Sequence, residues 1–172
     1  MVGDPGRATG LEVAVEPWRL LETLLERGIA ALAASDHELQ FEPKATYPLL
    51  TDVMGVISTV NDTFPRGVEP DGLLKQADGR ILATFEAKYS NRPKREHVFQ
   101  SLATAAALSS PLAILVYPWA EAPRRFEVTG FHGHPASLAT VGVDLFGYRR
   151  GDGDKALAAI FRELLGAHSL AR

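Results

Sequence analysis

The sequence of 172 residues predicts an α/β fold in which helices flank a mixed β-sheet. An Asp78-Gly79 pair between two apolar runs predicts an antiparallel hairpin, because the favoured two-residue turn needs positive φ at both central positions. A helical segment and then a continuous apolar run follow this hairpin, which is typical of a crossover to a buried parallel strand. Helical periodicity near both ends of the chain supplies the flanking layers.

Each expected element has a local signal. The expected helices span residues 17–34, 94–109 and 154–168, and the expected strands span residues 39–42, 68–76, 81–88, 112–117, 125–131 and 138–146. Pro17 suits the first turn of a helix, and Asp154 suits the N-cap of the last one. The first helix carries an apolar stripe that we expect to face the core: Trp18, Leu21, Leu25, Ile29 and Leu32.

Composition indicates one globular domain. A chain of this length with 46% apolar residues can bury a single core, so we expect a flexible N-terminus over residues 1–10 and one domain over residues 11–172. The lack of cysteine excludes a thiolate metal site, a disulfide scaffold and an iron–sulfur cluster. No signal peptide or 18-residue apolar run is visible, so we expect a cytoplasmic protein that does not enter the membrane.

The predicted hairpin brings two acids together at its open end. With a two-residue turn, paired positions sum to 157, so Asp71 faces Glu86 with Cβ atoms about 5 Å apart. Strand alternation places Lys88 on the same face as Glu86. Two carboxylates this close repel each other, and a divalent cation would remove the repulsion. The pattern therefore predicts a small metal site, with a solvated hairpin carrying a surface salt bridge as the alternative.

The same residues carry a family resemblance. Pro70-Asp71 followed by Glu86-Ala87-Lys88 resembles the signature of the PD-(D/E)XK nuclease superfamily, which has the restriction-endonuclease-like fold. The similarity covers residues 68–118 and is greatest to the McrC-type nuclease subunit of modified-cytosine restriction systems, where a helical glutamine and an apolar strand ending in Tyr-Pro follow. Gln100 and Tyr117-Pro118 match these features, whereas Thr104 stands where a tyrosine is frequent.

The resemblance implies a metal-dependent DNA endonuclease that hydrolyses phosphodiester bonds, as the nuclease component of a restriction or phage-defence system. It implies Mg²⁺ as the cofactor, with Mn²⁺ as a substitute. The implied metal ligands are Asp71, Glu86, the backbone carbonyl of Ala87 and the first-helix Glu22, and the implied catalytic residues are Asp71, Glu86, Lys88 and Gln100. Glu22 as an ordinary boundary glutamate and Gln100 as an ordinary exposed residue remain the alternatives.

The expected partners are DNA and a second protein. Arg92, Lys94 and Arg95 follow the proposed site directly and are predicted to contact phosphates, with a merely solvated loop as the alternative. The net charge of −3 predicts weak intrinsic DNA affinity, so we expect a separate recognition or NTPase subunit, or a second copy of this chain, to assist. Other hypotheses are a structure-specific resolvase or repair nuclease, and a non-catalytic DNA-binding or assembly domain of the same fold.

Overall fold

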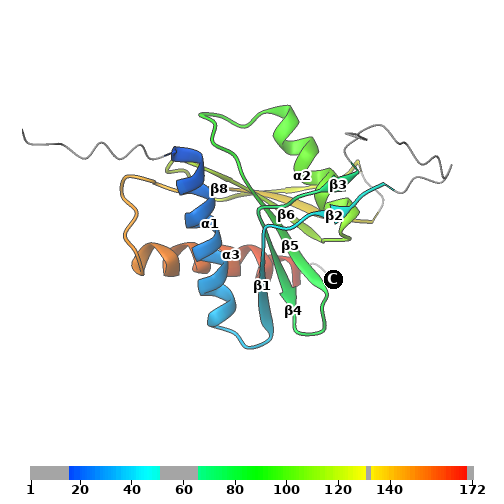
Figure 1. Ribbon diagram of the computed structural model, residues 1–172, viewed down its shortest axis with the longest axis horizontal. Helices are drawn as coiled ribbons and strands as arrows, with labels where there is room; N and C mark the ends of the chain where they lie inside the picture. Colours follow the sequence, from blue (N-terminus) through cyan, green and yellow to red (C-terminus); the bar gives the residue numbers. More distant parts are fainter. Residues whose placement is uncertain (1–15, 51–65, 131–132, 170–172) are drawn as a thin grey trace, which may run out of the picture.

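The computed structural model describes residues 16–50, 66–130 and 133–169 (Figure 1). The N-terminal segment expected to be flexible, residues 1–10, lies outside these ranges, as do the first residues of the expected domain.

A six-stranded mixed sheet forms the centre of the described structure. Its strands, in spatial order, are β1 (Leu39–Pro43), β4 (Gly72–Gln76), β5 (Ile81–Ala87), β6 (Leu112–Tyr117), β8 (Ser137–Gly142) and β7 (Arg124–Glu127). β1, β4 and β5 are antiparallel neighbours, β5, β6 and β8 are parallel, and β7 runs antiparallel to β8. A short antiparallel ribbon, β2 (Tyr47–Pro48) and β3 (Gly67–Val68), stands apart from this sheet.

Helices cover both faces of the sheet. α1 (Pro17–Ala34) and α3 (Asp152–Ser169) pack against each other and against one face, and α2 (Arg95–Ala107) covers the other (Figure 1). The α1–α3 contact is close at Gly28, where an added Cβ would lie 2.6 Å from Leu157 Cδ2. In the same layer the rings of Phe85 and Phe161 meet edge to face, with centroids 4.9 Å apart. The predicted α/β class is confirmed.

The hairpin keeps the predicted register at the site but not the predicted turn. The Gln76 N–H donates to the Arg80 carbonyl at 2.8 Å, so three residues form the loop, and Gly79 takes the positive φ of +88°. An irregularity next to the Leu74–Ala83 pair absorbs the extra residue. Beyond it, paired positions again sum to 157, as in Gly72–Phe85 and Leu73–Thr84. The prediction of a two-residue turn was wrong, yet the register beyond the irregularity is the predicted one.

Two other local predictions need correction. Trp18, expected on the buried stripe of the first helix, is 45% exposed, because it lies in the first turn of α1 and its ring faces solvent and Arg19. Asp154 is not the N-cap of α3, since the helix begins at Asp152. Its carboxylate instead accepts a hydrogen bond from the Gly151 N–H at 3.0 Å. In a capping box the side chain at helix position N3 makes this contact to the N–H of the N-cap residue, which here is Gly151.

Strand ends also differ from the predicted ones. The strand expected over residues 68–76 begins at Gly72, because Val68 pairs with Tyr47 in the separate ribbon. β8 ends at Gly142, before the expected end at residue 146.

Among the helices of the described ranges, none is long and apolar enough to span a bilayer.

Candidate active site

A cleft of about 480 Å³ opens where β4 begins and β5 ends, near α2, with the β2–β3 ribbon and α1 forming its other walls. Every residue predicted for catalysis or metal binding lines this cleft: Glu22, Asp71, Glu86, Ala87, Lys88 and Gln100. The structure therefore brings together residues that are as much as 78 positions apart, counted from Glu22 to Gln100. Lys44, Glu69 and Thr104 also line the cleft, although sequence reasoning gave none of them a role.

Asp71 is buried and fixed by the strand next to it. Its Oδ2 accepts a hydrogen bond from the Ala87 N–H at 2.8 Å, and its own N–H donates to the Phe85 carbonyl at 3.0 Å. Its other oxygen, Oδ1, accepts from the Lys44 ammonium at 2.9 Å. Both carboxylate oxygens are thus engaged, one by the backbone and one by a cation.

Lys44 reaches Asp71 because of how the sheet is ordered. β1 pairs with β4 in a register whose positions sum to 115, and one further step along that register sets Lys44 opposite Asp71. The hydrogen bond with Asp71 raises the pKa of Lys44. The Glu42-Pro43-Lys44 triplet was visible in the sequence, but nothing local predicted that its strand lies beside β4.

Glu86 is buried more deeply, with 2% of its surface exposed. Burial raises its pKa, and the charge of Lys88 acts against that rise. Lys88 Nζ donates to Glu86 Oε2 at 2.9 Å, and the Thr104 hydroxyl donates to Oε1 at 3.3 Å. Strand alternation accounts for Glu86 and Lys88 sharing a face, as predicted.

Gln100 holds the other side of Lys88. Its Oε1 accepts from Lys88 Nζ at 3.0 Å, so this exposed helix residue contacts the cleft. Thr104 lies one turn further along α2 and contacts Glu86. A hydroxyl at position 104 therefore contacts the buried acid.

Glu22 approaches Asp71 through Lys44, whose ammonium lies 3.7 Å from the Glu22 carboxylate. Partial burial raises the pKa of Glu22, and the negative charge of Asp71 adds to that rise. Sequence reasoning expected repulsion between Asp71 and Glu86 that only a divalent cation would remove. In the structure each of these acids has an ammonium partner, Lys44 for the first and Lys88 for the second.

The donor set of the cleft fits magnesium. Within the described ranges, no three His, Cys, Asp or Glu side chains form a cluster able to hold a metal ion, so Glu22 does not complete a three-carboxylate site. Mg²⁺ commonly binds one or two carboxylates and keeps several waters. Asp71, Glu86 and a backbone carbonyl are hard oxygen donors of that kind, and the Lys44 ammonium shows that the position beside Asp71 accepts a cation.

The basic residues predicted to contact DNA lie elsewhere. Arg92, Lys94 and Arg95 are exposed in the loop before α2 and in its first turn, and none of them lines the cleft. The Lys94 ammonium lies 3.6 Å from a carboxylate oxygen of Glu96. Pro93, between the first two basic residues, lines a second pocket on the far side of α2.

Comparisons with known proteins give a likeness of fold. No family model matches the sequence, and no curated protein matches it. A chain in the solved tetradecameric assembly of Thermococcus gammatolerans McrB AAA+ hexamers with bound McrC is similar in structure, with a TM-score of 0.54 and 11% sequence identity. The likeness covers 87% of this chain and 34% of that one, so this chain spans about a third of its length. At such low identity the likeness shows a shared fold alone.

Proposed function

We propose that this protein is a metal-dependent DNA endonuclease that hydrolyses phosphodiester bonds. The observation that carries the proposal is that two buried carboxylates, Asp71 and Glu86, line one cleft with Lys88, whose side chain is largely buried. The resemblance of these residues to the PD-(D/E)XK signature supports it. So does the likeness of fold to a chain in an assembly that contains McrC.

Mg²⁺, with Mn²⁺ as a substitute, would be held by Asp71, Glu86 and the carbonyl of Ala87. When bound there, such an ion polarises a phosphoryl oxygen and lowers the pKa of its bound water. The protein's own residues would position the two carboxylates. Thr104 orients the Glu86 carboxylate through a hydrogen bond, and the hydrogen bond from Ala87 orients Asp71.

Lys88 is the group that would stabilise the transition state. Its side chain is 15% exposed and its ammonium is held between Glu86 and Gln100, at 2.9 and 3.0 Å. A fixed ammonium stabilises negative charge that develops on phosphoryl oxygens better than a mobile one does. Gln100 acts through Lys88 and is therefore a positioning residue.

We further propose that a partner protein delivers the DNA. Glu22 and Glu69 lie in the cleft near the acids, and the net charge of −3 gives the chain little general attraction for phosphates. The similar solved chain belongs to an assembly of McrB AAA+ hexamers with McrC. An NTPase or recognition subunit is thus the proposed partner, in a restriction or phage-defence system acting on DNA in the cytoplasm.

Incubation with DNA tests this function. Plasmid, linear duplex, single-stranded and branched DNA are each mixed with the protein in Mg²⁺, Mn²⁺ or a chelator. Cleavage is expected only with a divalent ion, and Glu86→Gln should abolish it while Glu163→Gln, at an exposed position on α3, should not. Cleavage of branched DNA alone would indicate a resolvase. Binding of DNA without cleavage under every one of these conditions would contradict the proposal and favour a non-catalytic domain.

A further inference from the structure

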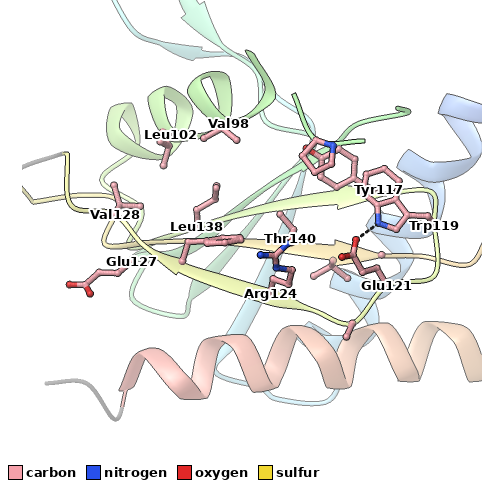
Figure 2. Close-up of a pocket in the computed structure, with 15 residues that line it drawn as sticks. Val98, Leu102, Tyr117, Trp119, Glu121, Arg124, Glu127, Val128, Leu138 and Thr140 are labelled. Atoms are coloured by element: carbon pink, nitrogen blue, oxygen red, sulfur yellow. Dashed lines mark hydrogen bonds between the residues drawn. The ribbon is translucent and has the colours of Figure 1, made fainter. Parts of the chain in front are cut away.

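A second pocket, of about 440 Å³, lies on the other side of α2 from the cleft (Figure 2). Val98 and Leu102 extend from α2 on one side, and Leu138 and Thr140 belong to β8 in the sheet on the other. α2 is therefore a wall common to both cavities, since Gln100 and Thr104 line the cleft. The volume falls within the range of about 300–1,000 Å³ that is usual for ligand pockets.

Three aromatic side chains line the pocket: Trp119, Phe126 and the fully buried Tyr117. Tyr117 and Trp119 stack with ring centroids 4.3 Å apart and an angle of 22° between the planes. Phe126, on the edge strand β7, lines the pocket with 39% of its surface exposed. Flat aromatic faces of this kind stack with planar rings, and they do so regardless of the identity of a nucleobase.

The pocket also has polar groups available for a ligand. Arg124 lies over the Phe126 ring at 5.1 Å, and Thr140 belongs to the sheet strand below. For the part of the chain that is described, neither the Arg124 guanidinium nor the Thr140 hydroxyl donates a hydrogen bond to a protein group. Glu121 adds a carboxylate, which accepts from the Trp119 indole N–H at 2.8 Å. Donors and acceptors beside aromatic walls suit a ring with a hydrogen-bonding edge.

Positive charge lies at the border of the same pocket. Pro93 lines it, and its neighbours Arg92 and Lys94 are exposed, as is Arg95 in the first turn of α2. An apolar side chain from a protein partner would use neither these cations nor the free polar groups. A nucleotide would use both, because its base is planar and polar at the edge and its phosphates are anionic.

We propose that this pocket binds the base of an unpaired nucleotide while Arg92, Lys94 and Arg95 contact the adjoining phosphates. The inference rests on the proposed action on DNA and names the substrate class as DNA with a single-stranded or extruded base. The loop that carries these cations begins near Lys88 in the cleft and passes Pro93 in the pocket, so it connects the two cavities. The basic residues predicted from sequence would thus contact phosphates next to the pocket, and they would act on the cleft only by holding the DNA near it.

The chain offers a built-in probe. It has two tryptophans, Trp18 on α1 and Trp119 in the pocket, so Trp18→Phe leaves tryptophan emission that reports on the pocket alone. This variant is titrated in a chelator with a single-stranded oligonucleotide, its duplex, and an abasic oligonucleotide of equal length. Quenching is expected with the single strand at about tenfold lower concentration than with the duplex or the abasic strand, since stacking of one base is worth about that factor or more.

Substitutions distinguish binding in the pocket from general binding of DNA elsewhere on the protein. Phe126→Ala in the Trp18→Phe background should raise the concentration for half-quenching about tenfold, and Arg124→Gln should raise it as well. Phe146→Ala is the matched control, because Phe146 is 96% exposed and lies outside the pocket. If Phe126→Ala does not fold by circular dichroism, Thr140→Val with Arg124→Gln takes its place.

Three outcomes overturn the inference: equal quenching by single-stranded and abasic strands, equal quenching by duplex, or no quenching by any DNA. Because the titration is made without metal, it is independent of cleavage. If the protein binds DNA in a base-dependent way but cleaves none, only the proposed function is contradicted. If it cleaves DNA without base-dependent binding, only this inference is contradicted.

Discussion

The carboxylate of Asp71 accepts a hydrogen bond from the backbone N–H of Ala87, 2.8 Å away on the neighbouring strand. This bond ties Asp71, which directly precedes β4, to the residue between Glu86 and Lys88, and so fixes the position of this acid relative to both of them. A side chain held by the backbone of the next strand cannot relax away without breaking the hairpin end. Asp71 is therefore fixed at the end of the sheet by the strand beside it.

Asp71→Asn should reduce cleavage by about 10³-fold while the protein stays folded. Asparagine keeps an oxygen that can accept from Ala87 but loses the charge that would hold a metal ion, and removing one preorganised electrostatic group typically costs that much. Lys44, the ion-pair partner, is 42% exposed and can be solvated, so the melting temperature should change little. Plasmid nicking rates and thermal unfolding measure the two effects, and retained activity would remove Asp71 from the site.

Lys44→Met should strengthen divalent-metal binding by about two- to fivefold. In the structure the Lys44 ammonium occupies the position beside Asp71 that a metal ion would need, and an exposed ion pair of this kind is worth up to about 1 kcal/mol. Calorimetric titration with Mn²⁺ checks the affinity. Lys155→Met, at an exposed position on α3, is the control that keeps the net charge the same as in the test variant. Unchanged or weaker affinity in Lys44→Met would show that the two cations do not compete.

Lys88→Met should lower the turnover rate by about 10²- to 10³-fold and leave metal affinity within a few-fold of wild type. The lysine would act on charge that develops in the transition state, whereas the acids would hold the ion. Gln100→Leu should produce a smaller loss of turnover, because it frees the ammonium without removing it. Single-turnover kinetics and calorimetry separate the two effects. A Lys88→Met enzyme with full turnover would exclude the lysine from the chemistry.

Gly28→Ala should destabilise the fold by about 1–3 kcal/mol, because its Cβ would meet Leu157 at the close α1–α3 contact and force the helices apart. Gly166→Ala, on α3 with nothing within 4 Å of the added atom, should stabilise it by up to about 1 kcal/mol through helix propensity. Urea denaturation of both variants compares them directly. Equal effects of one sign would mean that the contact at Gly28 is not tight.

Asp154→Asn should weaken the dependence of stability on acid. The hydrogen bonds from Arg27 and Tyr148 hold the pKa of Asp154 well below its usual range, so the folded state binds a proton there less readily than the unfolded chain. The ion pair thus stabilises the fold above the ordinary aspartate pKa of about 4, and this contribution is lost as pH falls towards the depressed value. Thermal unfolding between about pH 2 and pH 6 should show a smaller decline in the variant than in wild type. Parallel declines would contradict this.

Local patterns predicted most of the fold. The first helix has the predicted bounds, Pro17–Ala34, because proline at its start and a regular apolar stripe are signals carried by neighbouring residues. The crossover from β5 through α2 to β6 is parallel, as a continuous apolar run after a helix indicated. The hairpin register at Asp71 and Glu86 survived an error in the turn, since the apolar face of the hairpin fixes pairing independently of loop length.

The sequence by itself determined the α/β class and the set of charged residues at the hairpin end, because periodicity and turn residues act over a few positions. Only the tertiary structure decided the cation beside Asp71, since Lys44 arrives there through the pairing of β1 with β4, strands separated by 28 residues of chain. The second pocket was likewise decided by tertiary packing, because its walls come from α2 and three sheet strands or their ends. Contacts between distant segments depend on how whole elements stack, and no local pattern specifies that.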